Sequence, residues 1–277
     1  MSCGLNGRKS GADQNSPLFS DLNSCGVAWL IPLIDSVQNQ YDQSISNSAI
    51  LNGVPGALLK LLLLNETQLY PLQPLNGANV FSVGQISRDT AILYLTQLVA
   101  DLGLQDTTVD QLIRDLDGFC NSACGDQNGI DNSEVSRAIE ATAFLLATFK
   151  SYVNQQSFIN ALQLTCSAIS QALKSTPNDN VLLQEQPYCL TDAQAQTLSV
   201  GWNSLSVDDQ WKLTMGAYNG GAFTIQISIM NAARNNATSF DWATVSGYMP
   251  ATIPGTSIST AGIIKYVRDV SQGTPGL

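Results

Sequence analysis

Histidine is absent from this 277-residue chain. Without imidazole, Ser-His-Asp and Cys-His nucleophilic catalysis are excluded and a catalytic zinc site is disfavoured, because these sites use histidine as base or ligand. Any acid-base chemistry must therefore come from carboxylates, tyrosine, lysine or cysteine.

Charge and long apolar runs are also scarce. Only 12% of residues are charged, the net charge is −10, and no basic block occurs. Nucleic acids and anionic membranes select for clustered Lys and Arg, so we expect neither as a partner. The leucine run Leu61 to Leu64, like every other apolar run in the sequence, is far shorter than the roughly 18 residues that span a bilayer, so we expect no transmembrane helix.

Residues 1–17 lack the apolar stretch of a signal peptide. We therefore expect either delivery by a route other than general secretion or a leader that has already been removed.

Cysteines are few for a disulfide scaffold of this size, and they leave the redox compartment open. The set is even: Cys3, Cys25, Cys120, Cys124, Cys166 and Cys189. Cys120 and Cys124 form a CxxxC without a second pair at zinc-finger spacing, which favours a disulfide or plain thiols over zinc. The acidic segment 115–134 departs from the EF-hand order and is interpreted as a polar loop rather than a calcium site.

Apolar spacing of three and four residues predicts helices over 33–45, 56–66, 87–103 and 133–156. Ser206 followed by Asp209 is typical of a helix start, and Asn219-Gly220-Gly221 of a helix end. The segment 222–236 fits a strand or a helix. We predict one mostly α domain over 27–272, with a flexible N-terminal arm at 1–26, an irregular insertion at 103–132 and a tail at 273–277.

Glu66 ends a segment of leucines. At 100° per residue it shares a helix face with Leu59, Leu62 and Leu63, whereas Lys60 points about a third of a turn away. A carboxyl group in such surroundings is desolvated, so its pKa rises and it can hold a proton near neutral pH, as a general acid must. The alternative is a helix-end residue that turns outward to water.

Four short motifs follow one another along the chain: Glu66-Thr67 after the apolar helix, residues 82–91 (SVGQISRDTA), residues 217–221 (AYNGG), and Tyr266-Val267. Their order resembles the lytic transglycosylase and goose-type lysozyme family over about residues 46–272. The resemblance implies a lysozyme-like α-helical fold with a cleft, peptidoglycan glycan strands as substrate, and no metal or cofactor.

The resemblance also implies roles for individual residues. Glu66 matches the catalytic acid and base, and Gln85 matches a glutamine that lines the sugar cleft. Tyr218 and Asn219 match the pair that contacts the sugars near the cleavage point and supports the glutamate. Tyr266 matches a late tyrosine on the opposite cleft wall. Without the resemblance, each of these residues also fits an ordinary structural position.

Several positions depart from the family pattern. Thr67 replaces a serine and keeps its hydroxyl group, so it stays a candidate for substrate binding. Ser82-Val83-Gly84 replaces Gly-Leu-Met. Ser87-Arg88 replaces Met-Pro, which removes a methionine that would pack against a sugar, whereas Thr90-Ala91 matches the end of the motif. Gly220 replaces an alanine, which we interpret as a mild change.

Most glycosidases use two carboxylates, whereas here only Glu66 has a motif around it. The resemblance implies that Glu66 protonates the bond between N-acetylmuramic acid and N-acetylglucosamine. It then accepts a proton from the C6 hydroxyl, so that a 1,6-anhydro ring closes without water.

Two alternatives stay open. One is hydrolysis as by goose-type lysozymes, with Asp89 positioning water. The other is a non-catalytic structural or peptidoglycan-binding component of a phage tail or injection device, attached through the N-terminal arm. In each case we expect action at the bacterial cell wall or periplasm, with virion-borne or device-borne delivery.

Overall fold

The computed structural model describes residues 39–67, 80–81, 86–87, 132–155, 158, 162 and 164–274. The predictions that concern the N-terminal arm, the helix over 87–103, almost all of the insertion over 103–132 and the pair Cys120 and Cys124 lie outside these residues. Of the predicted tail, only 273–274 are described.

The described chain is mostly helical, which confirms the prediction of a mostly α fold. Its elements in chain order are α2 (Asp42–Asn52), α3 (Gly56–Thr67), β1 (Val80–Phe81), β2 (Ile86–Ser87), α6 (Asn132–Val153), α8 (Cys166–Ser175), α9 (Asn180–Glu185), the 3-10 turn η5 (Gln186–Tyr188), α10 (Asp192–Asn203), α11 (Val207–Gly220), α12 (Ala222–Arg234), α13 (Trp242–Gly247) and α14 (Ala261–Gln272).

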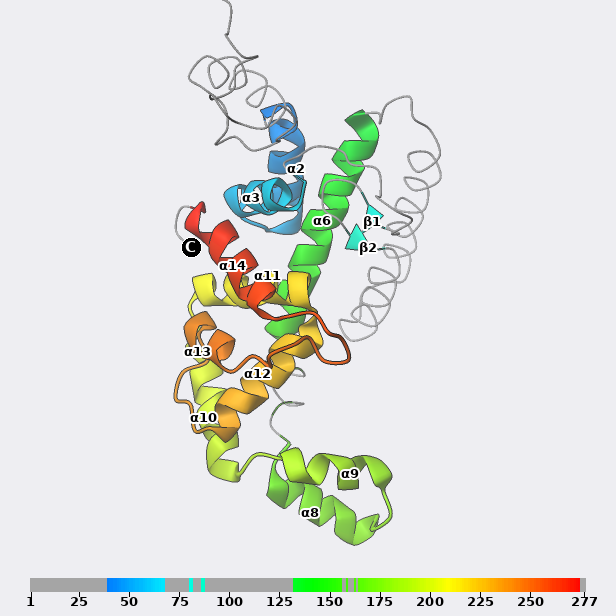
Figure 1. Ribbon diagram of the computed structural model, residues 1–277, viewed down its shortest axis with the longest axis vertical. Coiled ribbons are helices and arrows are strands. Elements are labelled where there is room, and N and C mark those ends of the chain that lie inside the picture. Colours follow the sequence, from blue (N-terminus) through cyan, green and yellow to red (C-terminus); the bar gives the residue numbers. More distant parts are fainter. Residues whose placement is uncertain are drawn as a thin grey trace, which may run out of the picture.

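Helix α6 runs along the middle of the molecule (Figure 1). It packs against α2 towards one end and against α11 towards the other, and α11 in turn contacts α12, α13 and α14. The α8–α9 hairpin projects at the end opposite α2 (Figure 1). Within the described ranges, none of the helices is both long and apolar enough to cross a membrane.

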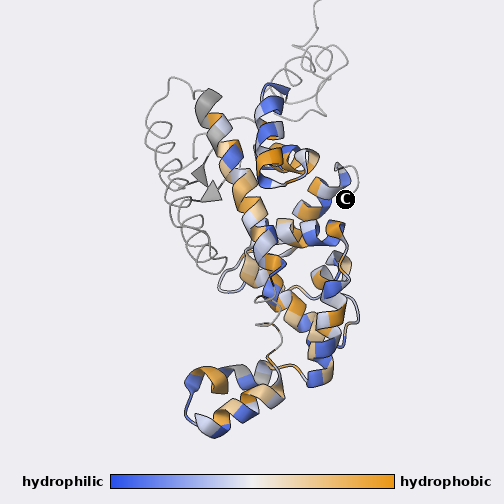
Figure 2. Cartoon of the chain, turned by 180° about the vertical axis from the view of Figure 1, so that it is seen from behind, coloured by the Kyte–Doolittle hydropathy of each residue, from blue (hydrophilic) through white to orange (hydrophobic). Residues whose placement is uncertain are grey.

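Helix α3 is apolar almost all round (Figure 2), a pattern that requires burial on several sides. Its neighbours are α2 and α14. Gly53 ends α2 in the left-handed conformation, at φ 64°, which reverses the chain so that α3 lies against α2. The predicted helix over 56–66 is thus confirmed.

Of the predicted helix over 33–45, residues 33–38 lie outside the described residues, and its last four residues, 42–45, are helical. Helix α2 begins at Asp42, and Tyr41 occupies its N-cap position. It continues past Ile45 to Asn52 because Ser48 and Ala49 also face the core. The predicted helix over 133–156 corresponds to α6, which ends at Val153.

Helix α11 begins as the sequence predicts, since the Ser206 hydroxyl accepts a hydrogen bond from the Asp209 backbone N–H at 3.0 Å. It ends at Gly220, and Gly221 follows at φ 82°. The ambiguous segment then forms α12. Ile225 and Ile229 are fully buried on one face, whereas Phe223 is exposed, so the alternating strand pattern does not hold.

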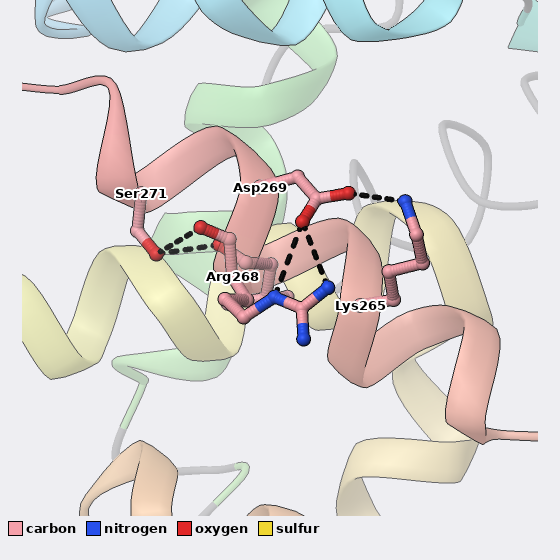
Figure 3. A network of polar contacts seen from close by, with 5 residues as sticks. Lys265, Arg268, Asp269 and Ser271 are labelled. Carbon is pink, nitrogen blue, oxygen red and sulfur yellow. Dashed lines mark hydrogen bonds and ion pairs between the residues drawn. The ribbon is translucent and has the colours of Figure 1, made fainter.

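Helix α14 has two distinct faces. Its buried face packs against α3 and α11 and includes Tyr266 and Val267. On the opposite face, Asp269 pairs with Lys265 and Arg268 (Figure 3). This division fixes which side of α14 meets the end of α3.

A disulfide joins Cys166 to Cys189 and closes the α8–α9 hairpin. The Cys166 backbone N–H also donates a hydrogen bond to the Leu190 carbonyl oxygen at 2.8 Å. The pairing of the cysteines was left open by the sequence, and it brings together two residues 23 positions apart.

Candidate functional site

The end of α3 places Glu66 at the edge of the core. Leu59, Leu62 and Leu63 are completely buried, and Glu66 is partly buried beyond them. Lys60 instead forms an ion pair with Asp42 at 2.7 Å. The face predicted for Glu66 is therefore confirmed, and the carboxyl group does not turn wholly into water.

Two tyrosines from later helices meet this carboxyl group. Tyr218 comes from the last turn of α11 and Tyr266 from the buried face of α14. Both tyrosines interact electrostatically with Glu66. Residues separated by up to 200 positions in the chain are therefore brought to one place. Tyr218 lies near Glu66, where the resemblance puts it, whereas Tyr266, expected on the opposite cleft wall, is a buried neighbour of the carboxyl group.

Burial sets the ionisation of the cluster. Desolvation raises the pKa of Glu66, and a contact with the Tyr266 hydroxyl opposes part of that rise. Burial, followed by the nearby Glu66 charge, raises the pKa of both Tyr218 and Tyr266 well above the usual range. The tyrosines therefore stay neutral, and Glu66 is biased towards its protonated form.

The Tyr266 hydroxyl is the least satisfied polar group of the cluster. The residue is only 7% exposed, and its oxygen has no well-formed hydrogen bond within the described part of the chain. It approaches the Glu66 carboxyl group closely enough to affect its pKa, but in poor hydrogen-bond geometry. A buried hydroxyl in this state costs free energy, and a small movement towards a charged carboxylate would satisfy it.

Thr142 and Phe149 complete the surroundings of Tyr218, and sequence reasoning missed both. Thr142 on α6 is fully buried and its side chain hydrogen-bonds Tyr218. The Phe149 ring meets the Tyr218 ring edge to face, at 6.4 Å between centroids. The available signal was a lone threonine on an apolar helix face, seven residues before a phenylalanine.

Among the described side chains, the structure brings no other predicted site residue to the Glu66 cluster. Asn219 follows Tyr218, but its side chain is exposed. Thr67 is the last residue of α3. Strands β1 and β2, which flank Gln85 in the sequence, pair antiparallel with Val80 opposite Ser87. Gln85, Asp89 and Thr90-Ala91 are outside the described residues, as is the side chain of Thr67.

The interpretation of Gly220 as a mild change is wrong. A Cβ atom at this position would lie 2.1 Å from Cδ1 and 2.8 Å from Cγ1 of Ile263 on α14. Ile263 is itself buried. The missing side chain thus permits the close approach of α11 and α14, the two helices that carry Tyr218 and Tyr266.

No known protein family, curated protein or solved structure shows significant similarity to this chain. The chemistry of the cluster must therefore be argued from its own residues.

Proposed function

We propose that this protein cleaves the β-1,4 bond between N-acetylmuramic acid and N-acetylglucosamine in peptidoglycan, with Glu66 as the single acid and base. The observation that carries the proposal is the convergence of three side chains: a partly buried carboxyl group at the end of α3 meets Tyr218 from α11 and Tyr266 from α14. The finer fold assignment, a lysozyme-like domain with a cleft beside Glu66, belongs to the same proposal.

The first step uses the raised pKa of Glu66. The protonated carboxyl group transfers its proton to the glycosidic oxygen, and the bond from this oxygen to C1 of the muramic acid breaks. The 2-acetamido group of the substrate stabilises the positive charge that develops at C1. Desolvation by the leucines of α3 supports this role, since it favours the acid form that the step consumes.

The second step returns the proton. The Glu66 carboxylate removes the proton of the C6 hydroxyl while this oxygen attacks C1, which closes a 1,6-anhydro ring. Glu66 ends protonated, no water is consumed, and the balance of protons needs no cofactor. The product is a shortened strand with an anhydro end.

Tyr266 suits the interval between these steps. Once Glu66 has lost its proton, its charge sits in a partly buried site. The Tyr266 O–H, which lacks a well-formed partner among the described residues, is placed to donate to that carboxylate. Burial favours the protonated form of Glu66, and the Tyr266 hydroxyl group favours its carboxylate form. Together they suit a residue that must act as acid and then as base in one turnover.

The disulfide supports the location that this activity requires. Disulfides persist in oxidising compartments outside the cytoplasm, and Cys166 and Cys189 are bonded. We therefore place the action of the protein at the bacterial cell wall, on glycan strands, with delivery by a virion or injection device as the accompanying hypothesis.

Replacing Glu66 by glutamine tests the proposal. Glu66→Gln keeps the shape of the side chain but cannot give or take the proton. We expect release of soluble fragments from purified cell walls to fall by about a hundredfold to ten-thousandfold.

The matched control is Glu140→Gln on the exposed surface of α6, which makes the same chemical change away from the cluster. It should clear walls at the parent rate. Full clearing by Glu66→Gln would exclude Glu66 as the acid, and equal loss in both variants would point to a general effect of charge.

A further inference from the structure

A polar cavity of about 410 Å³ lies where the end of α6 meets α10 and α11. Its lining combines one ammonium group, one hydroxyl group, three amides and one indole: Lys150, Ser151, Asn154, Trp202, Asn203 and Gln210. None of these lining residues is acidic, although the chain as a whole carries a net charge of −10. The cavity is therefore a local exception to the acidic character of the protein.

Lys150 gives the cavity its charge. Its ammonium group lies 4.2 Å from the centre of the Trp211 ring, and it makes neither an ion pair nor a hydrogen bond with the described residues. The side chain is partly buried, and desolvation lowers its pKa. The aromatic ring and the C-terminal end of α6 stabilise a cation here, but three N–H donors are left for a ligand.

The amides beside Lys150 are only partly used. One N–H of Asn154 donates to the Lys150 carbonyl oxygen at 2.8 Å, and one N–H of Gln210 donates to the Leu205 carbonyl oxygen. Within the described part of the chain, each of these two amides keeps a second N–H and a carbonyl oxygen without a partner, and Asn203 is exposed. Donors and acceptors that lie side by side suit a ligand with hydroxyl groups, because a hydroxyl group both donates and accepts hydrogen bonds.

We propose that this cavity binds an acidic saccharide, with the carboxylate on Lys150 and the sugar hydroxyls on the amides. The cavity shares the α6–α11 contact with the Glu66 cluster: Lys150 lies eight residues beyond Thr142, about 12 Å along α6. The cavity is therefore a second binding site, which lies near the Glu66 cluster but is separate from it. The identification of the saccharide as wall glycan, whose muramic acid carries a carboxyl group, rests on the proposed function.

A pair of disaccharides tests the charge recognition. The probe is N-acetylglucosaminyl-N-acetylmuramic acid with its free carboxylate, and the comparison is di-N-acetylchitobiose, which lacks it. Both are titrated into the Glu66→Gln protein by calorimetry, so that neither is consumed. We expect the acidic disaccharide to bind at least about tenfold more tightly, because it alone gains a charge-assisted hydrogen bond.

Substitution of Lys150 locates the site. Lys150→Met keeps the apolar stem over Trp211 and removes the charge, so it should weaken binding of the acidic disaccharide by about tenfold to a hundredfold. The exposed Lys174→Met is the charge-matched control and should change nothing. Lys150→Arg should keep the preference. Should Lys150→Met fold poorly, Asn203→Ala at an exposed position replaces it, with an expected loss of about threefold to tenfold.

The outcomes separate this site from the proposed function. Undiminished binding by Lys150→Met, or equal binding of the two disaccharides, would overturn the proposal even if the protein cleaves walls. Lys150-dependent binding of the acidic disaccharide would support the site even if Glu66→Gln still clears walls, in which case only the proposed cleavage is wrong.

Discussion

The helices around Glu66 and the α8–α9 hairpin are stabilised by different means. Around Glu66, α3 contributes side chains that are completely buried, and α11 and α14 pack against each other without a side chain at Gly220. In the hairpin, Ile169 is the buried residue of α8, whereas Val181, Leu183 and Tyr188 are exposed. The hairpin instead depends on the disulfide and on the helix caps at Thr165 and Asp179.

The difference shows where the fold can tolerate a costly polar group. The buried hydroxyl of Tyr266 and the desolvated carboxyl of Glu66 both reduce stability, and a large apolar core offsets that cost. The hairpin has no comparable core. We therefore expect the two regions to respond separately to mutation, with the loss of cleavage by Glu66→Gln as the largest effect.

Removing the disulfide gives the next largest effect. Replacing both Cys166 and Cys189 by alanine opens the loop between these two residues, which are 23 positions apart in the sequence. The chain-entropy relation predicts a loss of about 3 kcal/mol of unfolding free energy. Because the loss is local, hydrogen exchange should rise in α8 and α9 while the cleavage rate stays unchanged. A matching fall in cleavage would show that the regions are coupled.

Gly220→Ala should act on the other region. The added Cβ atom would overlap Ile263, and overpacking of this kind costs about 1–3 kcal/mol. We expect lower thermal stability together with slower cleavage, because α14 carries Tyr266 and must move away.

The companion substitution Ile263→Ala tests this explanation. It removes the Cγ and Cδ atoms that the new Cβ atom would meet, so the double variant should be more stable than the sum of the single effects predicts. Additive effects would mean that the contact between Gly220 and Ile263 does not limit the approach of α11 and α14.

The smallest expected effect is the dependence of stability on pH. The pKa of Glu66 is raised in the folded protein. The contribution of Glu66 to the unfolding free energy is therefore fully present below 4.5, the pKa of the unfolded state, and is lost as pH rises through the folded pKa. Glu66→Gln cannot ionise. The unfolding free energy of this variant, measured by urea denaturation, should therefore rise relative to that of the parent protein between pH 4 and neutral pH. A difference in unfolding free energy between the two proteins that does not change with pH would contradict a raised pKa of Glu66.

Local signals in the sequence predicted much of this fold. The leucine spacing placed Glu66 on its observed face, and Ser206 marked the start of α11, because both depend on residues a few positions apart. The segment 222–236 was ambiguous, since a strand and a helix leave similar apolar positions over a short window. Packing of Ile225 and Ile229 against neighbouring helices decides for a helix.

Contacts between distant helices could not be predicted in the same way. The hydrogen bond of Thr142 to Tyr218 joins residues of two helices and leaves no spacing pattern. The steric need for Gly220 depends on Ile263, 43 positions later. The resemblance put Tyr218 beside Glu66 but Tyr266 on the opposite cleft wall. It predicted neither the buried contact of Tyr266 with Glu66 nor the unsatisfied state of the Tyr266 hydroxyl, which only the packed structure defines.

Mass spectrometry of the fragments released from peptidoglycan tests the central claim most directly. If Glu66 serves as both acid and base without water, the parent protein should release muropeptides with 1,6-anhydro ends, and Glu66→Gln should release almost none. Fragments with reducing ends would show that water attacks C1, as in a hydrolase. The absence of any fragments, from the parent protein as from the variant, would contradict the assignment of Glu66 as a catalytic residue.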